Sequence, residues 1–105
     1  MKKWGLASGN PVWHLPHEGY EDRLKCDEAD IANVQPSGSK DAGASVGAAF
    51  VAEAVKATGF KGPFVHLDVA ATATAATGTD GLYKGTATGT PVPLLMEILF
   101  GLERA

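Results

Sequence analysis

Apolar and β-branched residues are densest at residues 64–70, directly after a Gly-Pro pair. In a strand, Val65, Leu67 and Val69 would point to one side and the alternate residues to the other. Neither side is polar throughout, which is typical of a strand covered by helices on both faces. This pattern predicts a strand of a sheet whose other members are not in this sequence, with two helices and loops packed around it.

The best helical pattern covers residues 44–58. Val46, Phe50 and Ala54 recur every four positions, which places them on one face of a helix. Lys56 falls in the last turn, where a cation interacts favourably with the helix dipole. Gly59 is well placed as the left-handed residue that ends the helix.

A second helix is predicted over residues 91–102. Thr90 is the expected N-cap, and Pro91 fits the first helical position. A helix as apolar as this must be covered on nearly all sides. Its apolar residues form a broad face: Leu94, Leu95, Met96, Ile98, Leu99, Phe100 and Leu102.

The pattern is weaker between these elements. A helix followed by a strand is one half of an α/β unit. The predicted fold class is therefore α/β, in one small domain over residues 1–105 with few strands of its own and two main helices. The remaining predictions are a short helix or the frayed end of one at 1–8, one or two helical turns within 17–25, and a mobile surface loop at 35–43. Residues 71–89 have little to bury and are expected to form a loop that crosses the end of the sheet.

The residue composition indicates a weak core. The chain has 105 residues, 45% of them apolar, but much of this fraction is alanine and there are 13 glycines. Small residues bury little surface each, so a self-sufficient core would be thin at a length where stability is already marginal. The composition therefore favours either an oligomer or a piece of something larger.

Charge and cysteine content exclude several classes of protein. The net charge is −3 and there is no basic cluster, which argues against nucleic-acid binding. Cys26 is the single cysteine, so no internal disulfide forms and a reducing compartment is expected. Because the sequence shows neither a signal-peptide core nor an apolar run of membrane-spanning length, we expect a soluble, cytoplasmic protein with no membrane partner.

Histidines offer few candidate sites. His14 and His17 are three residues apart, but the proline between them opposes a helix, and an exposed turn is the alternative to a metal pair. His66 and Asp68 would share one face of the predicted strand. A buried hydrogen-bonded pair is expected there rather than catalysis, because an isolated buried carboxylate is costly.

The other candidate features are also weak. Asp27, Glu28 and Asp30 lack the ligand spacing of a calcium loop, and the alternative to a hard-cation site is a solvated segment or a helix N-terminus. Residues 85–90 resemble a glycine-rich phosphate loop only superficially, because the Gly-Lys-Ser/Thr ending is absent. Cys26 has no neighbouring base and is expected to be a spare thiol. The residues alone assemble no catalytic set.

Four motifs stand in order along nearly the whole chain. The motifs are Trp13-His14-Leu15-Pro16 with Ala29-Asp30-Ile31-Ala32-Asn33, then residues 42–50, His66-Leu67-Asp68-Val69-Ala70, and residues 85–100. In that order they resemble four segments of the leucyl aminopeptidase family, a family of two-metal cytosol aminopeptidases. The family's segments are Trp-Arg-Leu-Pro to Ala-Asp-Ile-x-Asn, the helix Ala-Gly-x-x-x-Ala-Ala-x-Phe, the strand His-Leu-Asp-Ile-Ala-Gly and the closing Ala-Thr-Gly segment.

This resemblance implies the C-terminal portion of a three-layer α/β/α catalytic domain with a mixed sheet. The family removes N-terminal amino acids, leucine-like ones among them, from peptides, generally as hexamers and with two divalent metals, zinc or manganese. Its metal ligands are a lysine and several carboxylates, some within Asn-Thr-Asp-Ala-Glu-Gly-Arg, and they lie upstream of the matching region. The resemblance therefore assigns no catalytic residue, metal ligand or cofactor to this chain.

One substrate-binding residue carries over from the family. The alanine of its Asp-Ile-Ala-Gly motif lines the pocket for the first side chain of the substrate, and it matches Ala70. The end of a strand is where open α/β sheets place ligands. The glycine that follows in the family is Ala71 here, which adds a methyl group beside the pocket.

The main hypothesis is a segment of a metal-dependent aminopeptidase that is inactive by itself. Its partners would be the peptide substrate, the rest of the catalytic domain and further subunits. A non-enzymatic alternative is a truncated relative that self-associates through its two apolar helices as a scaffold or interaction module. In a third possibility, the chain is one piece of a cleaved or split enzyme whose metal site is on another chain.

Overall fold

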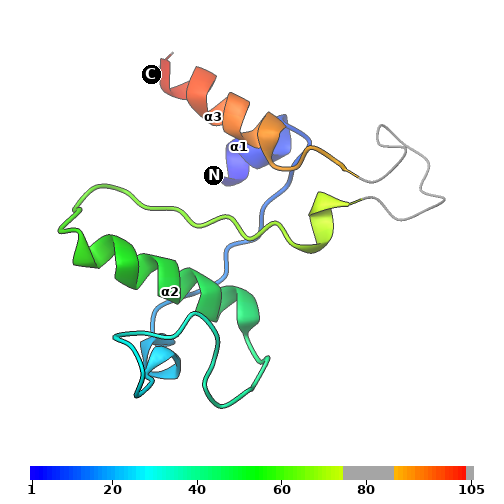
Figure 1. Ribbon diagram of the computed structural model, residues 1–105. Coiled ribbons are helices and arrows are strands. Elements are labelled where there is room, and N and C mark those ends of the chain that lie inside the picture. The colour runs from blue at the N-terminus through cyan, green and yellow to red at the C-terminus, as the bar shows by residue number, and fades with distance from the viewer. Residues whose placement is uncertain (75–86, 104–105) are drawn as a thin grey trace. The chain divides into compact units, whose positions relative to one another are not determined.

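The computed structural model describes residues 1–74 and 87–103. The chain divides into two compact units, a terminal unit made of Met1–His14 with Val69–Ala105 and a central unit made of Leu15–Asp68. The regular elements of the described residues are all helical (Figure 1): α1 (Lys2–Ala7), the 3-10 turn η1 (Glu21–Leu24), α2 (Gly43–Ala57), the 3-10 turn η2 (Ala71–Ala73) and α3 (Val92–Glu103).

The central unit is built on α2, and the helix predicted there is confirmed. Leu24, at the end of η1, is fully buried in one cluster with Val46 and Ala49 of α2. Ala54, expected on the same face as Val46, is exposed, and Ala52 is buried instead. The buried face of the helix is thus turned by roughly a quarter of a revolution from the predicted one, toward Ser45, Ala49 and Ala52, because the cluster forms against Leu24 of η1. The partly buried side chains around the cluster are Tyr20, Ile31 and Phe50.

Both ends of α2 carry a residue with positive φ. The helix ends as predicted, with Thr58 as C-cap and Gly59 in the left-handed region at φ 76°. At the start, Ala42 is the N-cap at φ 54°, and its carbonyl oxygen accepts a hydrogen bond from Val46 N at 2.9 Å. Alanine rarely adopts this conformation because its Cβ crowds the following carbonyl group, so the start of α2 is strained.

The loop before α2 is tied to η1 by a buried amide. Gln35 is only 9% exposed, and its Oε1 accepts a hydrogen bond from Arg23 Nη1 at 3.2 Å. Its Nε2 donates to the carbonyl oxygen of Asp41 at 2.9 Å. Since Arg23 belongs to η1 and Asp41 directly precedes Ala42, this one side chain fixes the approach to α2.

The terminal unit brings α1 against α3, and both predicted helices are formed. Leu94 of α3 is 1% exposed. Further along α3, Gly101 lies against Trp4 of α1, where a β-carbon on Gly101 would come within 2.5 Å of the indole Nε1. The absence of a side chain at Gly101 therefore allows the indole ring to reach the α3 backbone.

The start of α3 lies one residue further along than predicted. Pro91, rather than Thr90, stands immediately before the first helical residue, Val92. The carbonyl oxygen of Pro91 accepts a hydrogen bond from Leu95 N at 3.0 Å, as expected of an N-cap residue. Val92 N donates to the carbonyl oxygen of Gly89 at 2.8 Å, which continues the turn that leads into the helix.

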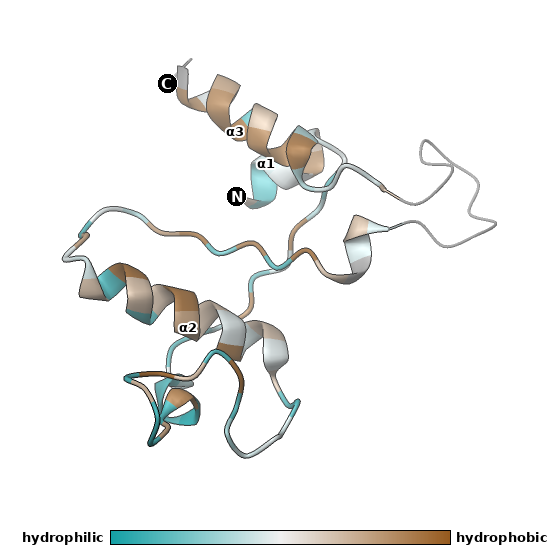
Figure 2. Cartoon of the chain, in the orientation of Figure 1, coloured by the Kyte–Doolittle hydropathy of each residue, from teal (hydrophilic) through white to brown (hydrophobic). Residues whose placement is uncertain are grey.

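Most of the apolar surface of α3 is uncovered in the described structure. The expectation that this helix is covered on nearly all sides is therefore wrong for the described residues, because the terminal unit supplies only α1 to pack against it. Figure 2 shows hydrophobic colour along much of α3. Six side chains that are 43% to 60% exposed are named the α3 stripe: Val92, Leu95, Met96, Leu99, Phe100 and Leu102.

The strand predicted at residues 64–70 is not formed. Figure 1 shows this stretch as a long connection without a strand arrow. Residues 64–67 make no main-chain hydrogen bond to any other residue that the structure describes. A strand requires a neighbour that pairs with its N–H and C=O groups, and no described segment provides one. The sheet of the predicted α/β class is therefore missing from the described residues.

The predicted loop at residues 71–89 begins with η2, and residues 75–86 of this loop lie outside the described ranges. Thr74 and Ala87 form an isolated antiparallel bridge. Thr88 donates from its main-chain N to the carbonyl oxygen of Ala73 at 3.0 Å and from Oγ1 to that of Thr72 at 2.6 Å. In the part of the chain described, no helix has the length and apolar character needed to cross a bilayer.

Candidate functional site

Ala70 is an exposed residue at the entrance to η2. Its carbonyl oxygen accepts a hydrogen bond from Ala73 N at 3.4 Å, which closes the turn. The bonds from Thr88 to residues 72 and 73 fasten this turn to the segment that leads into α3. The main chain beside Ala70 is therefore held by a second segment, while the alanine itself is accessible to a neighbouring molecule.

The environment of Ala70 differs from the predicted strand end. Ala70 has φ −72° and ψ −73°, a helical conformation rather than an extended one. The strand on which the prediction depended is not formed, and the chain turns into η2 at this point. The structure thus places Ala70 on a short, anchored turn, and its predicted role in substrate binding stays a prediction.

The pair predicted at His66 and Asp68 is not buried. Asp68 is exposed and His66 is half-buried. The prediction assumed a covered strand, and the uncovered segment leaves both side chains accessible to water. The cost of an isolated buried carboxylate, which motivated the pair, does not arise here.

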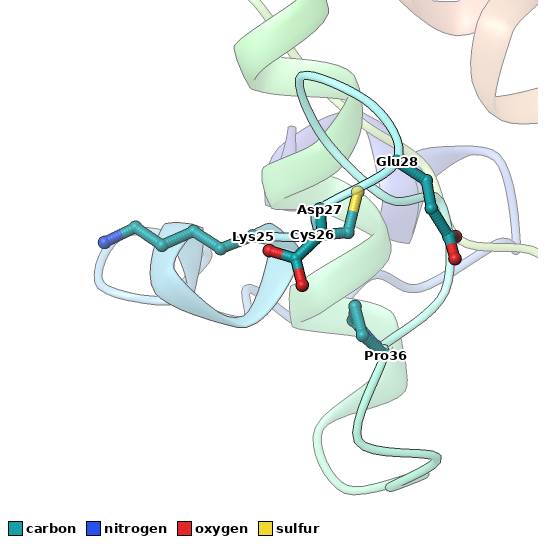
Figure 3. Close-up of a pocket in the computed structure, with 5 residues that line it drawn as sticks. All are labelled: Lys25, Cys26, Asp27, Glu28 and Pro36. Carbon is teal, nitrogen blue, oxygen red and sulfur yellow. The ribbon is translucent and has the colours of Figure 1, made fainter.

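A shallow pocket of about 290 Å³ lies beside η1 in the central unit. Lys25, Cys26, Asp27, Glu28 and Pro36 line it, and Figure 3 shows that their polar groups diverge rather than meet at one point. The thiol of Cys26 donates to the carbonyl oxygen of Ala29 at 3.2 Å.

The side chains that line this pocket do not converge into a catalytic or ligand-binding arrangement. Lys25 extends away from the other lining side chains, and its Nζ lies 2.7 Å from Asp22 Oδ1. Asp27, Glu28 and Asp30 are exposed, which agrees with the solvated alternative for the acidic cluster. Cys26 is half-buried and has no basic side chain as a partner among the described residues, in agreement with a spare thiol.

The described residues do not fit a two-metal centre. Within residues 1–74 and 87–103, no group of three or more His, Cys, Asp or Glu side chains is arranged to hold a metal ion. His14 is exposed, and His17 has its Nδ1 3.8 Å from Glu18 Oε2. The glycine-rich stretch at 85–90 lies partly outside the described residues.

Surface ion pairs in the central unit shift the pKa values of Lys56, Asp22 and Lys25. Lys56 donates a hydrogen bond to Glu53 in the last turn of α2, and this bond, with the nearby charges of Glu53, Glu21 and Glu18, raises the lysine pKa. The hydrogen bond and charge of Lys25 lower the pKa of Asp22, and those of Asp22 raise the pKa of Lys25. All these groups are on the surface, so they are features of stability rather than of a catalytic site.

Sequence reasoning missed two structural side chains. Gln35 was assigned to a mobile loop, but it is buried and joins η1 to the start of α2. Thr88 was assigned to a loop with little to bury, but it anchors the turn beside Ala70. No local signal identifies either residue, since their partners are 6 to 16 positions away in the chain.

Comparison with known proteins gives a consistent result. The family model described as the cytosol aminopeptidase family, catalytic domain, matches residues 1–96. A probable cytosol aminopeptidase of Bordetella pertussis is 45% identical over 91 residues, which cover 86% of this chain and 16% of the relative. The corresponding protein of Azoarcus sp. is 42% identical over 106 residues, which cover 100% of this chain and 19% of the relative.

A third relative, the probable cytosol aminopeptidase of Paraburkholderia phymatum, is 41% identical over 99 residues, or 93% of this chain and 17% of the relative. The chain therefore spans between a sixth and a fifth of the length of these curated relatives. No solved structure matches. Because the family model covers residues 1–96 of the 105, the chain belongs to the cytosol aminopeptidase family and corresponds to part of its catalytic domain.

Proposed function

We propose that this chain is the C-terminal part of the catalytic domain of a metal-dependent aminopeptidase, which removes leucine-like N-terminal amino acids from peptides in the cytoplasm. The observation that carries the proposal is the match to the family's catalytic domain over residues 1–96. The relatives' printed name, probable cytosol aminopeptidase, supports both the reaction and the compartment.

The unpaired segment at residues 64–67 supports the larger fold. Its N–H and C=O groups need partners once they are removed from water, and its apolar alternation suits a covered strand. In the complete domain, this segment becomes a strand of a mixed sheet between two layers of helices. The central and terminal units then supply helices that flank the sheet.

In this proposal, the preceding part of the domain carries the metal ligands, and this chain contributes to the substrate pocket. The two metals, zinc or manganese, belong to that preceding part, because the family's lysine and carboxylate ligands have no counterpart in the matching motifs. Ala70 lines the pocket for the first side chain of the substrate, on the turn fastened by Thr88. The complete enzyme assembles as a hexamer, and this chain alone has no peptidase activity.

A chimera tests this division of work. The 105 residues replace the aligned region of the Azoarcus relative, which matches the whole of this chain. We expect the chimera to hydrolyse leucine p-nitroanilide with added zinc or manganese, and the isolated chain to show no turnover. The intact relative is the positive control, and the relative without the aligned region is the negative one. An inactive but folded chimera, or turnover by the isolated chain, would contradict the proposal.

The proposed role of Ala70 has its own test in the same chimera. Ala70→Leu fills part of the pocket for the first side chain, so kcat/KM should fall roughly tenfold or more for a leucine substrate and less for an alanine substrate. Ala44→Leu, a similar change on α2 in the central unit, is the control for general disturbance. An equal loss for both substrates would refute a role in selecting the first side chain.

A second candidate function is a non-enzymatic, self-associating scaffold. The observation that favours it is the α3 stripe, an exposed apolar surface of the kind that marks interaction sites. Light scattering of the isolated chain distinguishes the two proposals. A discrete, stable oligomer together with an inactive chimera would favour the scaffold.

A further inference from the structure

The α3 stripe occupies one continuous side of its helix. At about 100° per residue, the positions of its six members fall within an arc of about 160°. Leu94 and Gly101, which pack inside the terminal unit, fall on the opposite side. α3 therefore has two apolar sides, of which one packs inside the terminal unit and the other is not covered by the described residues of that unit.

The stripe is as large as the largest apolar patches found on monomeric proteins. A large apolar side chain has an accessible area of roughly 150–200 Å², and those of the stripe are about half exposed, so together they present roughly 500–600 Å². The largest apolar patch on a typical monomer is about 300–600 Å² and is often functional. Here it occupies a single helix of 12 residues in a chain of 105.

The chemistry of the stripe defines the kind of partner. None of its six members is charged. Of the two glutamates of α3, Glu97 falls outside the arc, whereas Glu103, the last residue of the helix, falls within it. An uncharged, aliphatic and aromatic surface is matched by another apolar surface rather than by an acidic or basic one. The contact would exclude water along about three turns of helix.

We propose that the α3 stripe is the surface by which this chain docks onto an apolar face of the preceding part of the same catalytic domain. This inference rests on the proposed function and names the contact that joins the two parts. The chain spans only 16% to 19% of its relatives, so more than four-fifths of a complete family member is available to cover the stripe.

Area favours this occupant over a second copy of the chain. Two copies pairing through their stripes would bury roughly 500–600 Å² each, whereas a stable interface buries about 800 Å² per partner. Free partners must also offset the entropy lost on association. A covalently attached partner has a high effective concentration, so the same area suffices within one polypeptide.

The test uses two substitutions at the centre of the stripe. Val92→Gln and Leu99→Gln, both at residues 58% exposed, are introduced together into the isolated chain and into the Azoarcus chimera. We expect the urea midpoint of the isolated chain to stay nearly unchanged, because surface substitutions have small effects. In the chimera, we expect the thermal midpoint to fall by about 5 °C or more, because two polar groups are buried in an apolar contact.

Leu6→Gln is the matched control, since Leu6 is a leucine of the same unit, 75% exposed and outside the stripe. Leu6→Gln should leave the urea midpoint of the isolated chain and the thermal midpoint of the chimera unchanged. An unchanged chimera with the stripe variant would overturn the docking proposal, as would equal destabilisation of the isolated chain and the chimera. A dimeric isolated chain that becomes monomeric with the variant, beside an unaffected chimera, would identify a second copy as the occupant and also overturn it.

The experiment distinguishes refutation of the enzymatic role from refutation of the docking surface. An inactive but folded chimera without substitutions refutes the enzymatic role, while its thermal midpoint still reports whether the stripe is covered. A chimera that is active and insensitive to Val92→Gln with Leu99→Gln refutes only the docking surface.

Discussion

The indole Nε1 of Trp4 lies against the backbone of Gly101, so close that a β-carbon on Gly101 would come within 2.5 Å of it. This contact joins α1 to α3, the two helices of the terminal unit. The two tryptophans of the chain, Trp4 and Trp13, both belong to this unit. Tryptophan fluorescence therefore follows the unfolding of the terminal unit, while the central unit is followed by circular dichroism of α2.

The Trp4–Gly101 contact predicts opposite effects for two identical substitutions. Gly101→Ala gains helix propensity of about 1 kcal/mol but forces the indole away from α3, so we expect a net loss of about 1–2 kcal/mol in the unfolding free energy. Gly47→Ala in α2 meets no atom within 4 Å and should gain about 0.5–1 kcal/mol. Urea unfolding measures both, and a stabilised Gly101→Ala variant would show that the indole moves aside freely.

Ala42 predicts a stabilising substitution at the start of α2. Its φ of 54° is strained for alanine and unstrained for glycine. Ala42→Gly should therefore raise the unfolding free energy by about 0.5–1 kcal/mol, after the larger chain entropy of glycine in the unfolded state is subtracted. Ala44→Gly, two positions later inside the helix, is the control and should lower it by about 1 kcal/mol. Equal losses for both variants would contradict a left-handed Ala42.

Truncation of Leu24 should cause the greatest loss of unfolding free energy in the central unit. It is fully buried against Val46 and Ala49, so Leu24→Ala should lower the unfolding free energy by about 2–5 kcal/mol. Much of the ellipticity of α2 would then be lost at 25 °C, since a small domain has little stability to spare. Leu6→Ala, the same change at a residue 75% exposed, should have an effect within about 0.5 kcal/mol. A mild effect at Leu24 would mean that η1 does not hold α2.

The Lys56–Glu53 pair predicts a pH dependence in the alkaline range. Because the pairing raises the lysine pKa, its contribution is complete below the unfolded pKa of about 10.4 and is lost as pH rises through the folded value. The difference in stability between the wild type and Lys56→Met should thus be constant at neutral pH and shrink above about pH 10. Lys61→Met, at an exposed lysine outside this ion pair, is the control for the removal of a surface charge.

The lowered pKa of Asp22 predicts a pH dependence of stability in the opposite direction, in the acid range. The pairing with Lys25 contributes above the unfolded pKa of about 3.9 and is lost as pH falls through the lower folded value. Asp22→Asn should therefore differ from the wild type at pH 7 and converge with it in strong acid. Added salt should reduce both differences, because the groups are on the surface.

The sequence predicted helices well because their information is local. The four-residue spacing of Val46 and Phe50 and the glycine at position 59 are contained in the helix itself, and α2 ends where they indicate. The start of α3 was misplaced by one residue because both Thr90 and Pro91 are acceptable before a helix. Residues 64–70 do not form the predicted strand because a strand needs a paired neighbour, and residues 64–67 have no main-chain hydrogen bond to any described residue.

The candidate site was less accessible to sequence reasoning. A motif resemblance singled out Ala70, but nothing in the local pattern indicated η2 or its bonds to Thr88. The burial of Gln35 depends on Arg23 and Asp41, which come together only when the loop folds back. Such contacts depend on the three-dimensional path of the chain, so periodicity does not predict them.

The bridge between Thr74 and Ala87 has a practical consequence for labelling the protein. Because it brings the two ends of the intervening stretch together, any sequence inserted there would leave and re-enter at the same place. Doubling the length of such an insertion costs only about 0.6 kcal/mol in closure entropy. A fluorophore-binding tag placed between these two residues would sit a few residues from Ala70 and would leave the start of α3 intact.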